Sequence, residues 1–266
     1  MTVLVLGRGF LGSAIAAALG SEARLASHAQ ATDPRLLEGV RCVVWAGRHP
    51  ALGTPAWSLA HDGEPLFARR AAERGIAFVS LGTRKVYASS PRPLREDDPL
   101  GPADLYGRHK LALEEALSRV PGLALTRLRL ANVFGFERDL RRNSFMTRLL
   151  DTLARTGEVR FDVSPFTVRD FLPIEEAAAW VAALAREPPG GVVNLGSGVP
   201  SPIGRLALRV IEGFGRGRLV IEDPRERDAF VLDVGRLRAL LPQAKVDAAR
   251  IEAAAFALGR RLAAAG

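Results

Sequence analysis

The sequence predicts an α/β protein, with a doubly wound parallel sheet and a small C-terminal α/β lobe. Short apolar runs alternate with helical patterns from the first residues onward, as in a parallel sheet covered on both faces. The first apolar run, residues 3–6, ends at the glycine-rich turn of residues 7–12. With 266 residues, 48% of them hydrophobic, the chain is long enough for one large domain with a modest appendage.

Each element of the first half follows from a local pattern. Residues 3–6, 23–26, 41–45, 76–81 and 123–130 are predicted strands, and residues 3–6 and 76–81 are the most continuously apolar of them. Between them, residues 11–19, 64–74 and 104–119 have helical patterns, and Gly75 is a C-cap for the second of these helices. Asp33 before Pro34 starts a brief helix over residues 33–38.

The second half begins after Gly135, where the character of the sequence changes. We expect a polar loop at 138–142, a helix at 145–155 capped by Asn143 or Ser144, a helix at 174–186 and a strand at 192–195. The tail from Ile203 predicts two helices around a strand at 219–221. Residues 1–135, with returning segments near 166–197, form the predicted sheet domain, and residues 136–165 and 198–266 form the lobe.

The charge balance is positive, with a formal net charge of +8. Only three lysines occur (Lys85, Lys110 and Lys245), and arginine supplies the rest of the positive charge without a dense basic run. This distribution argues against a nucleic-acid partner. A moderate positive field would still attract a doubly charged diphosphate.

Three absences in the sequence restrict the compartment. Cys42 is the only cysteine, so no intrachain disulfide forms. No apolar stretch approaches the length of a membrane span, and the chain begins on a predicted strand without the features of a signal peptide. We therefore expect a soluble cytoplasmic protein without a membrane partner.

The turn Gly7-x-Gly9-x-x-Gly12 predicts a dinucleotide site. Gly7 permits the tight turn, Gly9 lets the backbone approach a pyrophosphate, and Gly12 lets the helix lie close to the strand. The helix N-terminus adds unpaired N–H groups and the positive end of a dipole. We assign Arg8, Phe10 and Leu11 to the same site.

The cofactor predicted from these residues is NADP(H) rather than NAD(H). An NAD site usually places an acid at the end of the second strand, and here that end carries His28 with no acid. Arg8 could reach a 2′-phosphate. Asp33 is the nearest acid, and besides capping a helix it is a candidate for contact with adenine.

Tyr106-Gly-Arg-His-Lys110 places a phenol and an ammonium group one helical turn apart on one face. A phenol is a poor acid or base at neutral pH, and a nearby ammonium group favours its ionised form. An ordinary surface pair is the alternative. Thr83 upstream and the glycine turn, in this order, favour a catalytic site.

Motifs in chain order resemble the extended short-chain dehydrogenase/reductase family, which comprises nucleotide-sugar epimerases, dehydratases and reductases. The resemblance runs over most of the chain. The motifs are Gly7-x-Gly9-x-x-Gly12, Gly82-Thr83-Arg84-Lys85-Val86-Tyr87, Arg95-Glu96-Asp97-Asp98-Pro99-Leu100, Tyr106-x-x-x-Lys110, Leu128-Arg-Leu-Ala-Asn132, Val168-Arg169-Asp170-Phe171, Val193-Asn194-Leu195-Gly196 and Arg225-Glu-Arg-Asp228.

This resemblance implies a Rossmann-type fold and a role for each motif. Tyr106 exchanges a proton with the substrate, Lys110 supports it and holds the nicotinamide ribose, and Thr83 hydrogen-bonds the same substrate oxygen. Asn132, Arg169 and Arg225 bind the nucleotide-sugar substrate, although Arg169 could instead pair with Asp170. Family members commonly dimerise through the helix bearing the tyrosine and the helix before it, so we expect a homodimer.

Two departures from the family pattern limit the specific function. The dehydratases carry Asp-Glu directly after the catalytic threonine, where this chain has Arg84-Lys85, so dehydration is disfavoured. An asparagine that orders an active-site water is replaced by the region of His61, which is either a substitute or an exposed loop residue. We expect a reductase of a keto-sugar nucleotide. A nucleotide-sugar epimerase with tightly held NAD and a non-catalytic NADP sensor or scaffold are the alternatives.

Overall fold

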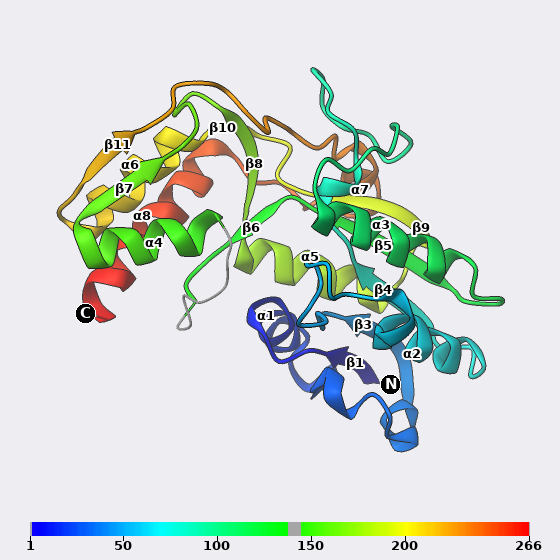
Figure 1. The fold of residues 1–266 in the computed structure, drawn as a ribbon. Coiled ribbons are helices and arrows are strands. Elements are labelled where there is room, and N and C mark those ends of the chain that lie inside the picture. The colour runs from blue at the N-terminus through cyan, green and yellow to red at the C-terminus, as the bar shows by residue number, and fades with distance from the viewer. Residues whose placement is uncertain (1, 138–144, 266) are drawn as a thin grey trace.

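The computed structural model describes residues 2–137 and 145–265, and its centre is a six-stranded parallel sheet. The strand order is β2-β1-β3-β4-β5-β9, so the chain runs outward in one direction from β1 to β2 and then returns to build the other side (Figure 1). These strands are β1 Thr2–Leu6, β2 Ala23–Ala26, β3 Val40–Trp45, β4 Ala77–Leu81, β5 Leu125–Leu130 and β9 Gly191–Leu195. The order reverses between β1 and β3, where doubly wound sheets bind their ligands.

Alternating strand residues divide the core into two clusters, one on each face of the sheet. Val3 and Val5 face Ile15 of helix α1, whereas Leu4 and Leu6 belong to the cluster that contains Phe67 of helix α2. Helices α1 and α5 therefore cover one face, and α2 and α3 cover the other (Figure 1). Their bounds are α1 Phe10–Leu19, α2 Gly63–Ala72, α3 Leu105–Ser118 and α5 Ile174–Arg186.

The lobe lies beside the carboxyl end of the sheet and contains two smaller sheets (Figure 1). Strands β10, β8 and β6 form one of them, and β11 and β7 form the other. The remaining elements are β6 Asn132–Phe134, α4 Phe145–Thr156, β7 Glu158–Phe161, β8 Val168–Pro173, β10 Pro200–Pro202, α6 Ile203–Phe214, β11 Arg218–Ile221, α7 Gly235–Leu240 and α8 Ala248–Ala265.

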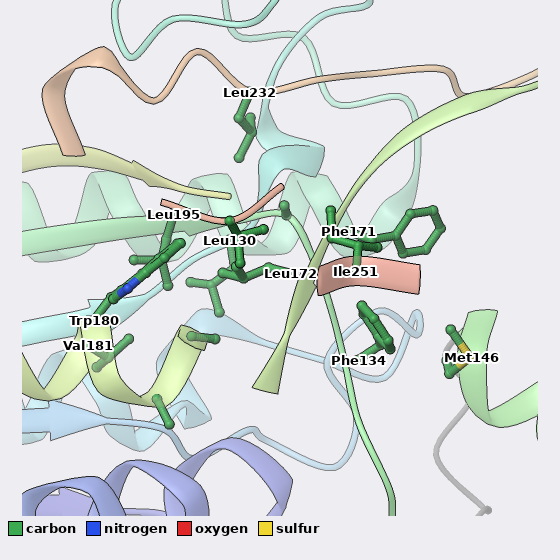
Figure 2. Close-up of a cluster of buried hydrophobic side chains, with 14 of the residues drawn as sticks. Leu130, Phe134, Met146, Phe171, Leu172, Trp180, Val181, Leu195, Leu232 and Ile251 are labelled. Carbon is green, nitrogen blue, oxygen red and sulfur yellow. The ribbon is translucent and has the colours of Figure 1, made fainter. Parts of the chain in front are cut away.

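One hydrophobic cluster continues from the sheet into the lobe. Leu130 and Leu195 of the main sheet lie in the same cluster as Phe171 of β8, Met146 of α4 and Ile251 of α8 (Figure 2). Burial of side chains from both parts in one core couples the lobe to the sheet.

The predicted doubly wound sheet is confirmed, and the lobe differs in detail from the prediction. Three helices rather than two follow Ile203, because α7 precedes α8, and strands β6, β7, β8 and β10 were not predicted. The loop at 138–142 and the caps Asn143 and Ser144 lie outside the described residues. In the part of the chain that is described, no helix is both long and apolar enough to cross a membrane, and no cluster of three metal-binding side chains occurs.

Candidate active site

The turn after β1 is shaped by its glycines. A Cβ on Gly12 would lie 1.8 Å from the carbonyl oxygen of Gly7, and one on Gly7, whose φ is +122°, would lie 2.6 Å from the backbone of Ala46. Gly9, by contrast, faces open space, with no atom within 4 Å of its ideal Cβ position. Gly9 is also the N-cap of α1, and no side chain caps this helix end. An uncapped helix N-terminus beside open space fits the pyrophosphate of a dinucleotide.

The segment after β2 carries the residues that were predicted to contact the adenosine end of the cofactor. His28 begins a 3-10 turn and lies under Gly47, whose ideal Cβ position is 2.8 Å from the His28 Cβ. Asp33 caps the next 3-10 turn by accepting a hydrogen bond from the Arg35 N–H at 2.9 Å, which is the capping role expected of it. Arg8 is exposed at the rim of the glycine turn.

Helix α3 carries Tyr106 in its first turn and is held tightly to the end of β4. Asp104 caps the helix by accepting a hydrogen bond from the Gly107 N–H at 2.7 Å, and it also pairs with Lys85. A Cβ on Gly107 would lie 2.4 Å from the Lys85 carbonyl oxygen, so only glycine permits this approach. The close contact places Tyr106 beside the turn that begins at Thr83.

Lys110 lies one turn further along α3 and is buried. Its Nζ donates a hydrogen bond to the Leu81 carbonyl oxygen at 2.9 Å, at the end of β4. Thr83 accepts a hydrogen bond from the Lys85 N–H at 3.3 Å through its Oγ1. Since that contact uses an acceptor site, the Thr83 hydroxyl hydrogen is available to a substrate oxygen.

A cavity of about 930 Å³ opens above these residues and extends into the lobe. Thr83, Tyr106, Asn132 and Arg169 all line it, as does Leu11 of the glycine turn. The structure thus brings two of the three predicted catalytic residues, Thr83 and Tyr106, together with Asn132 and Arg169 of the predicted substrate contacts. Lys110 is not among the lining residues and lies behind Tyr106.

A loop after β3 forms the wall beside Tyr106 and is fixed to α3 by His109. The Gly53 N–H donates to His109 Nδ1 at 3.2 Å, and the Trp57 ring stacks on the His109 ring with centroids 4.2 Å apart. Arg48 from the same loop lies 5.7 Å from the centre of the Tyr106 ring. His109, inside the Tyr-x-x-x-Lys motif, therefore positions the wall of the cavity.

Two arginines share one aspartate at the lobe side of the cavity. Arg84 pairs with Asp228 through both ends of its guanidinium group, one of them at 2.5 Å, and its charge centre lies 3.8 Å from the centre of the Phe230 ring. Arg169 lies 3.8 Å from the Asp228 carboxylate and donates to backbone oxygens of Arg227 and Asp228. One carboxylate between two arginines leaves a net positive charge facing the cavity.

The surroundings of Asp228 and Asp170 shift the pKa values of these two carboxyl groups in opposite directions. Burial acts to raise the pKa of the Asp228 carboxyl, but hydrogen bonds and charge from Arg84 and the charge of Arg169 outweigh it, so the pKa lies below its ordinary value. Burial raises the pKa of Asp170, which accepts hydrogen bonds from Ser197 and from the Leu232 N–H. Asp170 therefore ties strands together, and Arg169 contacts Asp228 rather than Asp170.

Arg225 is not brought into the site. Its exposed side chain pairs with Asp223 at 2.6 Å and is absent from the described lining of the cavity. Arg227, two residues later, lines the cavity instead. His61 is exposed, which matches an ordinary loop residue, and the buried Asp62 beside it accepts a hydrogen bond from Trp57 Nε1 at 2.9 Å.

Comparison with known proteins agrees with this geometry. Residues 66–196 match the NAD dependent epimerase/dehydratase family. The chain is similar to this family over nearly half of its length. The match spans β4, the Thr83 turn, helix α3 and the strands up to β9.

Two curated relatives align with about half of this chain. A dTDP-6-deoxy-L-talose 4-dehydrogenase (NAD(P)(+)) of Kitasatospora kifunensis is 33% identical over 55% of this chain, and a dTDP-4-dehydrorhamnose reductase of Streptomyces griseus is 36% identical over 44%. These alignments span 49% and 37% of the relatives' own lengths.

A solved structure extends the likeness of fold to the whole chain. The UDP-N-acetylglucosamine 4-epimerase from Methanobrevibacter ruminantium M1, in complex with UDP-N-acetylmuramic acid, has a TM-score of 0.85 at 19% identity. The alignment covers 100% of this chain and 99% of that one. At this identity the likeness concerns the fold alone.

Several residues that line the cavity were not assigned from the sequence. They are cationic: Arg48, Arg148, Arg160 and Arg227, together with Arg84 and Lys85, which were noted only as departures from the dehydratase pattern. Arg227 could have been found from its place in the same Arg-Glu-Arg-Asp segment as Arg225. The others are dispersed along the chain, and only the fold gathers them.

Proposed function

We propose that the protein is an NADP(H)-dependent reductase of a keto-sugar nucleotide. The observation that carries the proposal is the single cavity that joins Thr83 and Tyr106, with Lys110 behind them, to the cationic wall of Arg169 and Arg227. One end offers proton transfer, and the other offers recognition of a doubly charged group.

The chain's own residues supply the proton chemistry. Tyr106 donates its phenolic proton to the substrate carbonyl oxygen, while the Thr83 hydroxyl donates a hydrogen bond to the same oxygen and fixes its position. The Lys110 ammonium group has further N–H donors besides the one given to Leu81, and these would hold the ribose of a bound cofactor. The bound nicotinamide supplies the hydride.

The substrate class follows from the cavity and agrees with the names of the relatives. Guanidinium groups bind phosphate oxygens through two parallel hydrogen bonds, which suits a nucleoside diphosphate. This proposal is supported by Arg169 and Arg227, which line the cavity together with Asn132 of β6. The sugar then lies toward Tyr106, beneath the loop of Arg48.

The preference for NADP(H) rests on the end of β2. No acid follows this strand before Asp33, and Asp33 is engaged as a helix cap. Arg8, exposed at the rim of the turn, would reach toward a 2′-phosphate.

The test is to denature the purified protein, identify any released nucleotide, and titrate the emptied protein with NADPH and NADH. An empty site that prefers NADPH supports the reductase, and keto-sugar nucleotides would then be screened as substrates. Stoichiometric bound NAD would contradict the reductase and indicate an epimerase. Failure to bind either cofactor would contradict both.

A further inference from the structure

The side chain of Glu64 carries a buried carboxyl group that has no part in the chemistry above. Glu64, in the first turn of α2, is 1% exposed. Its Oε1 accepts a hydrogen bond from the Ser80 Oγ at 2.5 Å. Ser80 precedes Leu81, whose carbonyl oxygen accepts the hydrogen bond from Lys110. Glu64 and Lys110 are thus anchored to neighbouring residues of β4.

Lys110 needs a counter-charge, because a buried ammonium group without one is costly. It is 7% exposed, and in the described part of the chain no carboxylate forms a direct ion pair with it. The nearby Glu114 is already engaged, since Arg129 binds its carboxylate at 2.9 Å.

The other charged groups around Glu64 do not replace it. Asp62 and Glu114 are acids, and Asp62 accepts hydrogen bonds from Trp57 and from the Glu64 N–H. The charge of Lys110 is the largest attractive influence on the Glu64 carboxyl. Glu64 and Lys110 are therefore opposite charges on α2 and α3 that are each hydrogen-bonded to adjacent residues of β4.

We propose that Glu64 is a positioning residue for the Tyr106–Lys110 pair, and that its carboxylate keeps the buried ammonium group charged and in place. The inference rests on the proposed function, because Lys110 matters only if Tyr106 transfers a proton. The carboxylate acts on Tyr106 through Lys110 and not directly.

The charge of Glu64 changes within the physiological pH range. Burial raises the pKa of the Glu64 carboxyl to about 7, against the attraction of Lys110 and the hydrogen bond from Ser80. The Glu64 carboxyl group is therefore fully ionised, and balances the charge of Lys110, only above neutral pH.

The test uses the chain's two tyrosines and needs no substrate. Burial raises the pKa of Tyr87 to about 12, so the ultraviolet absorbance of the phenolate between about pH 7 and pH 11 reports Tyr106. A Tyr106→Phe control removes the signal. The titration is recorded for the wild type, Glu64→Gln, Lys110→Met and the double variant. Glu115→Gln, an exposed acid on α3, is the matched control.

We expect Lys110→Met to move the Tyr106 ionisation midpoint to higher pH. Glu64→Gln should move it in the same direction, with the ionisation constant reduced about threefold or more. In the Lys110→Met background Glu64→Gln should have no effect, and Glu115→Gln should have none in either background. Ser80→Ala, which removes the hydrogen bond to Glu64, should give a smaller change of the same sign.

Three outcomes would overturn the inference. A shift of equal size in both backgrounds would show that Glu64 acts on Tyr106 directly. An unchanged or lowered midpoint in Glu64→Gln would show that Glu64 does not support the ammonium group. An unchanged midpoint in Lys110→Met would contradict the catalytic pair itself, and with it the proposed function.

Discussion

The position of Tyr106, the proposed proton donor, depends on several neighbouring residues. The Asp104 cap fixes the first turn of α3, the missing side chain of Gly107 lets the helix reach the Thr83 turn, and His109 holds the loop that carries Arg48 over the phenol ring. Each contact restricts the position of the phenolic oxygen, and such preorganisation is worth more than a single hydrogen bond.

The first prediction at this scale concerns Tyr106→Phe. The change removes the proton donor and leaves the cavity wall intact, so turnover of the substrate should fall by a factor of about 10³ or more. NADPH affinity, measured by fluorescence titration, should stay within about twofold of the wild type, because no cofactor contact is lost. Retention of most of the activity would refute the assigned role.

A second prediction concerns the pH dependence of stability through Glu64. Because its pKa is raised in the folded protein, the native state binds a proton that the unfolded chain releases, so the stabilisation present at acidic pH is lost as the pH rises through about 7. Relative to Glu64→Gln, the free energy of unfolding of the wild type should fall by up to about 3 kcal/mol between pH 5 and pH 9. Urea unfolding at several pH values tests this, and parallel curves would exclude a raised pKa.

The sequence predicted some site residues and missed others for physical reasons. Thr83, Tyr106 and Asn132 belong to local motifs, and they do line the cavity. Arg225 was expected there but does not line the cavity, whereas Arg227, which pairs with the same Asp223, does line it. The burial of Glu64 results from contacts between α2, α3 and β4, which no local pattern reveals.

At the scale of elements, the turn from β1 to α1 contains glycines with different surroundings. A Cβ at position 12 would collide with the Gly7 carbonyl oxygen, whereas one at position 9 would meet no atom. The fold therefore requires glycine at position 12 but not at position 9, although both positions belong to the same motif.

Gly12→Ala and Gly9→Ala form a matched pair for this distinction. Gly12→Ala should destabilise the fold by about 3 kcal/mol or more, since the clash involves backbone. Gly9→Ala should leave the melting temperature nearly unchanged and weaken NADPH binding about tenfold or more, because its methyl group occupies the space for the pyrophosphate. Differential scanning fluorimetry and cofactor titration measure the two effects. A Gly9→Ala variant with normal cofactor affinity would place the pyrophosphate elsewhere.

The elements of the main sheet were predictable because strands such as β1 and β4 are rich in apolar residues and lie between turn residues. The strands of the lobe were not, since β6 and β10 have only three residues each and gain their partners from distant segments. Helix α7, of six residues, is likewise too short to show a helical period.

At the scale of the whole molecule, the cavity between the sheet and the lobe is lined by more cationic than acidic side chains. Its described lining contains seven cationic side chains and three acidic ones. These residues are far apart in the sequence: Arg48 lies in the loop after β3, and Asp228 lies shortly before Phe230. The formal charge of the chain as a whole has the same sign.

This charge predicts that nucleotide binding weakens with salt. The affinity for UDP or dTDP, measured by calorimetry, should fall about threefold to tenfold between ~50 and ~500 mM NaCl, because salt screens the cationic wall. Arg227→Ala should lower the affinity and flatten the salt dependence, and Arg225→Ala should change neither. Equal effects of the two variants would contradict the cavity as the diphosphate site.

Cys42 lies in the middle of β3 with its side chain in the core, and burial raises the pKa of its thiol to about 12. A thiol that does not ionise at neutral pH does not react with maleimides or disulfides. The native chain is therefore silent toward thiol reagents without any cysteine being removed. A cysteine introduced at exposed Leu208 on α6 would take up a single fluorophore, and so turn the lobe into a reporter of ligand binding.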